Sequence, residues 1–124
     1  MPKCSAELTG ARREEIVAAC RKLYETMSYK AITVKEIAEE TSFTRPSIYN
    51  YFETKEEIFL ALFQQEYELF TAALETLLWE KDDLTLDELA AALARELGAR
   101  PMLLKLLSTN LYDMEANSRP ERLT

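Results

Sequence analysis

The sequence TVKEIAEETSFTRPSIYNYFETK, residues 33–55, decides the fold of this chain. Thr33 stands three residues before Glu36, and Thr54 stands three residues before Glu57. Each pair matches a capping box, in which a hydroxyl and a carboxylate bind unpaired backbone N–H groups at the start of a helix. The spacing therefore predicts that a helix begins directly after each threonine, short in the first case and long in the second.

Two short helices are predicted between these caps, at residues 34–40 and 45–51. Each is about two turns long, which is too short to be stable alone, so both must pack on neighbouring helices. Two short helices joined by a turn of a few residues form a helix-turn-helix, which commonly places its second helix in the major groove of DNA.

The second of these helices has two different faces. At about 100° per residue, one arc presents a guanidinium, a phenol, an amide and a rigid ring, whereas the other supplies an apolar anchor. The polar arc holds Arg45, Pro46, Tyr49 and Asn50, and the opposite arc holds Ser47, Ile48 and Tyr51, followed by Phe52. Arg can bind guanine bidentately and Asn can pair with adenine, so the polar arc predicts contacts with DNA bases. The alternative interpretation is the solvated face of a small helical protein.

The run ITVKEIAEE at residues 32–40 and the run TRPSIYNYFETKEEIF at residues 44–59 stand in fixed register. Together they resemble the N-terminal domain of the tetracycline-repressor (TetR-like) family. Its typical pattern is Thr-x-x-x-Ile-Ala, a turn, then Ser/Thr-x-x-x-apolar-Tyr-x-Tyr/His-Phe-x-x-Lys-Glu-x-apolar. The resemblance covers about residues 8–70. The matching positions are Thr33, Ile37, Ala38, Thr44, Ile48, Tyr49, Tyr51, Phe52, Lys55 and Glu56.

This resemblance implies a DNA-binding transcriptional regulator: a repressor that binds a palindromic operator on double-stranded DNA as a homodimer and is released by a small-molecule effector. It also implies that Thr33, Tyr51 and Lys55 contact the DNA backbone. The predicted DNA-binding residues are Thr33, Thr44, Arg45, Pro46, Ser47, Tyr49, Asn50, Tyr51 and Lys55. A second class of function stays open, in which a helical protein-interaction module (a truncated regulator) keeps the fold with little specific DNA affinity.

Two loops depart from the family pattern. Ser42 and Phe43 replace the usual Gly of the turn between the two short helices, and Ser28 replaces the Gly that commonly follows the first helix. Gly reaches left-handed backbone conformations without strain. Both loops are therefore predicted to be strained or differently shaped.

Almost all of the remaining chain is predicted to be helical, which gives an all-α fold. A first helix is expected from Gly10 to Met27, with Thr9 as its cap, with Cys20 in its buried stripe, and with Cys4 in a mobile arm before it. These helices form a three-helix helix-turn-helix DNA-binding domain over residues 1–55.

A long helix from Lys55 to about Glu80, roughly 39 Å at 1.5 Å per residue, packs on this domain and leads into a partial helical effector and dimerisation domain over residues 56–124. There, Thr85 and Glu88 form a third capping box for a helix that ends at Gly98. Pro101 is expected to open a last helix that extends to about residue 116, before a loop at residues 117–120.

The last helix is apolar on more than one side, which predicts cover by further helices, so the C-terminal domain is expected to be cut short. Its uncovered apolar surface, together with that of the long helix, predicts self-association. Phe70, Trp79 and Tyr112 are predicted to pack in a core rather than to line a ligand pocket.

The net charge of −7 is unevenly distributed. Residues 1–55 hold nine Lys or Arg against eight Asp or Glu, and residues 56–124 hold six against fourteen. This asymmetry indicates a DNA-facing N-terminal part and an acidic body. The predicted phosphate contacts are Arg12, Arg13, Lys30, Lys35, Arg45 and Lys55.

Several classes of function are disfavoured by composition. The chain has no His, which excludes the usual Ser-His-Asp and Cys-His nucleophilic sites. Two cysteines sixteen residues apart lack the spacing of a zinc site. We therefore predict no enzymatic activity, no cofactor and no metal. The absence of a long apolar stretch and of a signal peptide predicts no membrane association and a cytoplasmic location.

Overall fold

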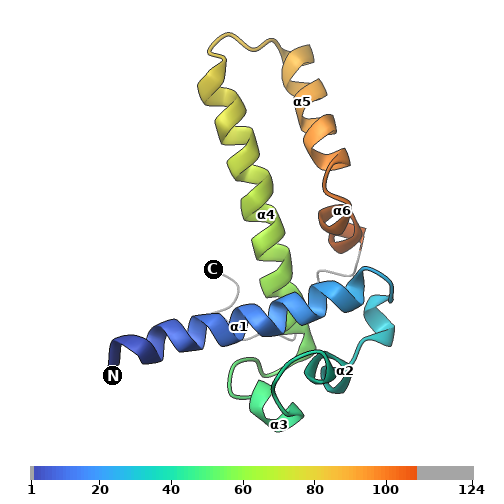
Figure 1. Ribbon diagram of the computed structural model, residues 1–124. Helices are drawn as coiled ribbons and strands as arrows, with labels where there is room; N and C mark the ends of the chain where they lie inside the picture. Colours follow the sequence, from blue (N-terminus) through green and yellow to red (C-terminus); the bar gives the residue numbers. More distant parts are fainter. Residues whose placement is uncertain (1, 109–124) are drawn as a thin grey trace. The chain divides into compact units, whose positions relative to one another are not determined.

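The computed structural model describes residues 2–108, with side chains from residue 8 onward (Figure 1). Every regular element in this range is helical, so the predicted all-α fold is confirmed. The elements are α1 (Pro2–Tyr24), the 3₁₀ helix η1 (Tyr29–Ala31), α2 (Val34–Glu39), α3 (Arg45–Ile48), α4 (Lys55–Glu80), α5 (Leu86–Gly98) and α6 (Pro101–Ser108). The predicted continuation of the last helix and the loop at residues 117–120 lie outside the described residues.

These helices belong to two compact units, which we call unit 1 (residues 2–62) and unit 2 (residues 63–108) within the described range. Unit 1 contains α1, η1, α2, α3 and the first two turns of α4. Unit 2 contains the rest of α4 together with α5 and α6. The helix α4 therefore runs without interruption from one unit into the other. The predicted domain division at residue 55 remains a prediction.

The core of unit 1 draws on all four of its α-helices. Phe59 is fully buried, and its ring meets Tyr24 and Tyr29 edge-on at centroid distances of 5.1 and 4.8 Å. Edge-to-face aromatic pairs of this kind stabilise a core beyond the area that they bury. The other fully buried side chains are Ile16 and Cys20 from α1, Ile32, Ile37 from α2, Ile48 from α3, and Ile58 and Leu62 from α4.

Cys20 lies in this core, as predicted, with no exposed surface. Burial raises the pKa of its thiol to about 12, because a thiolate there would lose its hydration. The side chain therefore acts as a small apolar residue.

Three predicted helix boundaries were wrong, including the end of α1, which lies at Tyr24 rather than at Met27. The helix α1 begins at Pro2, so Thr9 lies inside the helix instead of capping it, and the segment around Cys4 is helical in its backbone instead of forming an arm. The helix α3 ends at Ile48 rather than at residue 51. Its chain then tightens into i→i+3 bonds, in which the amides of Asn50 and Tyr51 donate to carbonyls three residues back.

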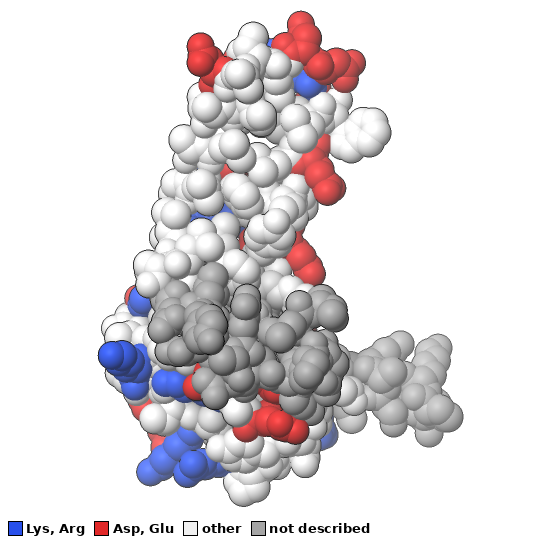
Figure 2. Space-filling view, turned by 180° about the vertical axis from the view of Figure 1, so that it is seen from behind, with Lys and Arg blue, Asp and Glu red and all other residues white. Residues whose placement is uncertain are grey.

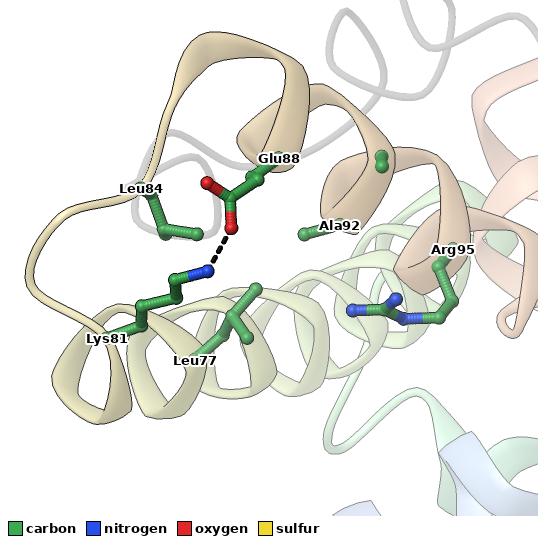
Figure 3. A pocket seen from close by; sticks show the side chains of 7 residues that line it. Leu77, Lys81, Leu84, Glu88, Ala92 and Arg95 are labelled. Atoms are coloured by element: carbon green, nitrogen blue, oxygen red, sulfur yellow. Dashed lines mark hydrogen bonds and ion pairs between the residues drawn. The ribbon is translucent and has the colours of Figure 1, made fainter.

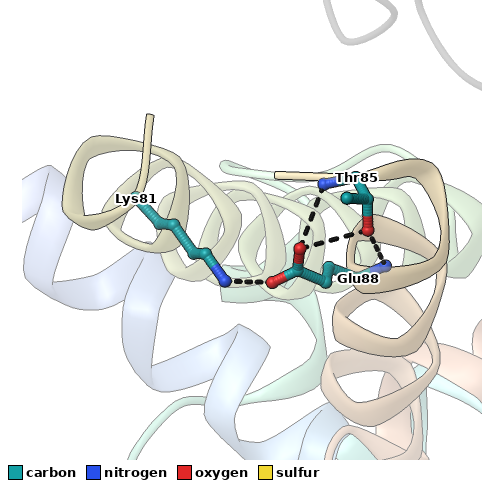
Figure 4. A network of polar contacts seen from close by, with 3 residues as sticks. All are labelled: Lys81, Thr85 and Glu88. Carbon is teal, nitrogen blue, oxygen red and sulfur yellow. Dashed lines mark hydrogen bonds and ion pairs between the residues drawn. The ribbon is translucent and has the colours of Figure 1, made fainter. Parts of the chain in front are cut away.

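In unit 2, α4 and α5 run antiparallel and are joined by a short loop (Figure 1). The predicted capping box opens α5: the Glu88 amide donates to Thr85 Oγ1 at 3.1 Å, and the Thr85 amide donates to Glu88 Oε1 at 3.3 Å (Figure 4). Lys81, just after α4, forms an ion pair with the same Glu88 carboxylate. The hydrogen bond from Lys81, followed by those from Thr85, lowers the pKa of Glu88.

The apolar side chains of unit 2 are unevenly covered. Leu103 and Leu106 of α6 and Ala92 of α5 are buried. By contrast, several large apolar side chains are about half exposed or more: Tyr67, Leu69, Leu78, Trp79, Leu86, Leu104 and Leu107. Trp79 is 85% exposed, so its predicted place in a core is wrong. No helix within residues 2–108 is long and apolar enough to cross a membrane.

Candidate nucleic-acid interface

Threonine side chains cap the starts of three helices in this region: α2, α3 and α4. Thr33 Oγ1 accepts from the Glu36 amide at 3.2 Å at the start of α2. Thr44 Oγ1 accepts from the Ser47 amide at 3.4 Å at the start of α3, which also carries Pro46 in its first turn. Such caps and an N-terminal Pro fix where a helix begins, even when the helix is short.

The cap of α4 differs in detail from the predicted box. Thr54 Oγ1 accepts from the Glu57 amide at 3.2 Å, as predicted. The Glu57 carboxylate, which is 1% exposed, accepts from the Glu53 amide at 3.0 Å. The carboxylate therefore reaches one residue further back than a standard box does, and it fixes the chain that leads from α3 into α4.

The predicted DNA-binding residues lie at the surface of unit 1, above a buried anchor. Ile48 and Phe52 are 0% and 2% exposed, which confirms them as the anchor of the α3 segment. The exposed members of the set are Thr33, Thr44, Arg45, Pro46, Tyr49 and Asn50, and the half-buried members are Ser47, Tyr51 and Lys55. Because α3 ends at Ile48, Tyr49 and Asn50 are presented by the turn after the helix.

The turn between α2 and α3 is built without a left-handed residue. None of the described non-glycine residues has a positive φ, so the strain predicted for Ser42 and Phe43 is absent. Instead, side chains bind the turn. Thr41 Oγ1 donates to the Ala38 carbonyl at 2.8 Å and accepts from the Phe43 amide at 3.1 Å, and Glu15 of α1 accepts from the Ser42 amide at 2.7 Å.

A cation–aromatic cluster joins α1 to both sides of α3. The Arg12 guanidinium lies 5.7 Å from the centre of the Phe43 ring and donates to the Tyr51 hydroxyl at 3.3 Å. The Phe43 and Tyr51 rings stack at 6.2 Å with an interplanar angle of 30°. The structure therefore brings two predicted phosphate contacts, Arg12 and Tyr51, together. Sequence reasoning missed Phe43 as their platform.

Lys55 has a geometry that the sequence did not predict. Its ammonium donates to the carbonyls of Tyr29 and Ile32 at 2.7 and 2.9 Å and lies 4.2 Å from the centre of the Tyr29 ring. Partial burial lowers the pKa of this ammonium. Lysine has three N–H donors, and the two carbonyls take two of them. The side chain therefore ties the start of α4 to the segment before α2.

The charges of unit 1 are nearly balanced, so a basic surface on this unit depends on where its Lys, Arg, Asp and Glu side chains lie. Counted through Leu62, the N-terminal part of the sequence holds nine Lys or Arg against ten Asp or Glu. Several acidic groups are bound within the unit: Glu57 is buried, Glu15 binds the turn, and Glu40 accepts an ion pair from Lys22 at 2.9 Å. On the face shown in Figure 2, the visible Lys and Arg side chains gather mainly over unit 1.

Unit 2 has a cavity of about 260 Å³ between the end of α4 and the start of α5 (Figure 3). Its apolar lining comes from Leu77, Leu84, Ala91 and Ala92, and its charged lining comes from Lys81, Glu88 and Arg95. Within the described part of the chain, no three His, Cys, Asp or Glu side chains are grouped so that they could hold a metal ion.

Unit 1 is thus a helix-turn-helix unit, in which a short capped helix presents polar side chains above an apolar anchor, and α4 leads away from it. The family described as "Bacterial regulatory proteins, tetR family" matches this chain over residues 16–62. The matched segment runs from the core of α1 to the end of unit 1 within α4. The chain is therefore TetR-like over residues 16–62, the segment that matches the N-terminal domain of that family.

Three relatives support this assignment. The "Uncharacterized HTH-type transcriptional regulator YfiR" of Bacillus subtilis is 33% identical over 58 residues, which are 47% of this chain and 28% of that protein. The "HTH-type transcriptional repressor Rv1474c" of Mycobacterium tuberculosis is 29% identical over 72 residues, 58% of this chain and 38% of that protein. The "HTH-type transcriptional repressor AcnR" of Corynebacterium diphtheriae is 32% identical over 66 residues, 53% of this chain and 35% of that protein. The matches thus span about a third of each relative's length.

Proposed function

We propose that this chain is a DNA-binding transcriptional regulator that acts as a repressor. The observation that carries the proposal is the exposed set around α3, with Arg45, Tyr49 and Asn50 at the surface and Ile48 fully buried beneath them. Side chains of these types suit base edges in the major groove. Two of the relatives are named as transcriptional repressors. A function of this kind requires no catalysis or cofactor, and it places the protein with the DNA, in the cytoplasm.

In the proposed complex, base contacts come from Arg45, Tyr49 and Asn50. Pro46 lies on the same base-facing arc. Backbone contacts come from Thr33, Thr44, Ser47, Tyr51 and Lys55, supported by the basic side chains of α1, η1 and α2. Phosphate contacts orient a protein on the duplex, whereas base contacts specify the sequence. The Arg12–Tyr51 pair lies beside Phe43 at the end of the helix-turn-helix turn, which suits a phosphate contact at the edge of the groove.

The experiment that tests the proposal is selection of duplexes from a random DNA pool by the purified chain. We expect enrichment of one sequence, and we expect binding to it to weaken steeply as salt rises. A scrambled duplex of the same composition is the control. Equal binding to selected and scrambled DNA would contradict the proposal and favour the alternative, a helical protein-interaction module.

We also propose that the regulator binds a palindromic operator as a homodimer, because two half-sites add their binding free energies. The exposed Leu78, Trp79 and Leu86 of unit 2 support this proposal, since solvent-facing apolar surface favours association. We expect sedimentation equilibrium to show dimers at about tens of micromolar, and Trp79→Gln to shift the equilibrium toward monomer. A clean monomer in this range would contradict the homodimer.

A small-molecule effector is the last part of the proposal. The unit 2 cavity of about 260 Å³ combines apolar walls with Lys81, Glu88 and Arg95. Because Lys81 and Glu88 pair with each other, Arg95 is left to suit a small apolar molecule that carries a negative charge. In Figure 3 the Arg95 side chain and the apolar Leu77 and Ala92 line the same space. A molecule of this class should raise the thermal stability of the chain and lower its affinity for the selected duplex.

Lys55→Ala is expected to weaken binding to selected and scrambled duplexes alike. One of its three N–H donors is available to a phosphate beyond the two carbonyls of Tyr29 and Ile32. Loss of one phosphate contact should reduce the magnitude of the slope of log K against log salt by about one. Binding measured over a salt series decides this. An unchanged slope together with a lower melting temperature would make Lys55 an internal tie only.

A further inference from the structure

The turn between α2 and α3 is hydrogen-bonded to α1 through the carboxylate of Glu15. Glu15 Oε2 accepts from the Ser42 amide at 2.7 Å, and the Ser42 hydroxyl donates to the same carboxylate at distances of 3.0 and 3.2 Å from its two oxygens. A hydrogen bond to a charged acceptor is shorter and about twice as strong as a neutral one. The turn residue that replaces a flexible glycine is therefore held from outside the turn.

Glu15 belongs to one face of α1 that binds the whole helix-turn-helix. Arg12 lies three residues before it and Lys22 seven residues after it, which places all three on neighbouring positions of the same helix surface. Lys22 pairs with Glu40 at the end of α2 at 2.9 Å. Arg12 contacts Phe43 and donates to the hydroxyl of Tyr51 after α3. Within this face, Glu15 binds the backbone of the turn through the Ser42 amide.

We infer that Glu15 is a positioning residue for DNA readout: it fixes the turn and, through the turn, the place of α3 and Arg45 relative to α1. The inference rests on the proposed function. The helix α3 is only four residues long, and its start is set by Thr44, two residues after Ser42. Bidentate base contacts depend on geometry, so a looser turn should reduce sequence discrimination before it reduces DNA affinity in general.

The charge of Glu15 makes the inference testable. A carboxylate near DNA is repelled by the phosphates, so removal of its charge alone should strengthen binding to every duplex slightly. If Glu15 positions α3, removal of its side chain should instead weaken binding, and it should do so on the selected duplex only. Ser42 lies within hydrogen-bond distance of both carboxylate oxygens, and single-base-pair variants of the duplex separate this role from a direct base contact.

The experiment compares the wild-type chain with Glu15→Ala, Glu15→Gln and the matched control Glu25→Ala. Glu25 is an exposed carboxylate just after the end of α1. On the selected duplex we expect Glu15→Ala to bind about tenfold more weakly, the factor for a loss of 1.4 kcal/mol. On a scrambled duplex, Glu15→Ala should bind as well as wild type or slightly better. Glu25→Ala should bind as well as wild type or slightly better on both duplexes. Identical behaviour of Glu15→Ala and Glu25→Ala would overturn the inference.

Two further measurements sharpen the result. Glu15→Gln keeps an acceptor oxygen, so we expect it to lose only about two- to threefold in discrimination, because a neutral acceptor is weaker. It also serves as the test if Glu15→Ala does not fold. Across single-base-pair variants of the selected duplex, Glu15→Ala should lose discrimination at every position that α3 reads. Loss at one base pair alone would indicate a direct contact by Glu15 and overturn the positioning role.

Amide hydrogen exchange tests the clamp without DNA. The Ser42 amide should exchange at least about ten times faster in Glu15→Ala than in wild type or Glu25→Ala, since an amide loses protection with its hydrogen bond. If the wild-type chain selects no duplex, the proposed function fails, while Ser42 exchange still reports the clamp. If the chain selects a duplex and Ser42 exchange does not depend on Glu15, the inference alone is overturned.

Discussion

Arg45→Ala should weaken binding to the selected duplex by about 1–3 kcal/mol and leave binding to scrambled DNA nearly unchanged. Arg45 is exposed at the first position of α3, and the helix is anchored from below by the fully buried Ile48. A guanidinium in this place can bind both acceptors of a guanine, and a scrambled duplex offers no fixed guanine to it. Binding measured on both duplexes at one salt concentration gives the two losses.

Lys30→Ala is the matched control for this prediction. Lys30 is an exposed basic residue of η1, in the same unit, and is predicted to contact phosphate. Its removal should weaken binding to both duplexes by similar amounts, because phosphates carry no sequence information. If Arg45→Ala also loses equally on both duplexes, Arg45 is only a phosphate contact, and base readout must depend on Tyr49 and Asn50.

Helix positions with strong local signals were predictable from the sequence. The helix α4 was predicted with both of its observed ends, because Thr54 caps its start and a long amphipathic run follows. The helix α5 was likewise delimited by the Thr85 box and by Gly98. Capping is encoded within three residues, so one sequence suffices to find it. The end of α3 was missed because the 100° rule assumes a regular helix, whereas this chain tightens after Ile48.

The contacts that position α3 were beyond sequence reasoning. Glu15 and Ser42 are 27 residues apart, and Arg12 and Tyr51 are 39 residues apart. Neither α1 residue stands in a motif: Arg12 was predicted only as a phosphate contact, and Glu15 has the sequence pattern of an ordinary solvated charge on an amphipathic helix. The missing turn glycine gave only a partial signal, since it predicted a strained or differently shaped turn and not the side chains that bind it. Only the packing of α1 against the turn identifies Glu15 as that support.

The same limitation applies to Lys55. The family pattern implied a phosphate contact for it, and its position at the start of α4 agreed. The pattern could not reveal that the ammonium also binds the carbonyls of Tyr29 and Ile32. A half-buried cation loses part of its hydration, so the donors that it turns into the protein need partners there. One side chain can therefore serve both the fold and the interface, and the salt series described above separates the two roles.

Phe59→Ala should destabilise unit 1 by about 3–5 kcal/mol, the usual loss when a buried Phe is truncated. The side chain is fully buried, and its ring contacts both Tyr24 of α1 and Tyr29 of η1, so the cavity would lie where the first turns of α4 meet α1 and η1. Small domains have net stabilities near the low end of about 5–15 kcal/mol, so most of the margin would be lost. Denaturant unfolding followed by circular dichroism measures the change.

The control for this prediction is Tyr67→Ala, which truncates an aromatic residue of the same helix that is 52% exposed. Surface truncations usually change stability by about 0.5 kcal/mol, although stacking on Phe63 at 6.1 Å can add a little here.

Phe59→Ala should also abolish binding to selected and scrambled duplexes together, because the phosphate contacts of α1 and α4 separate when the core between them opens. If Phe59→Ala still discriminates between the duplexes and loses less than about 1 kcal/mol of stability, this core does not hold α4 to α1 and η1. The loss on both duplexes distinguishes a failed scaffold from the selective loss expected of Arg45→Ala.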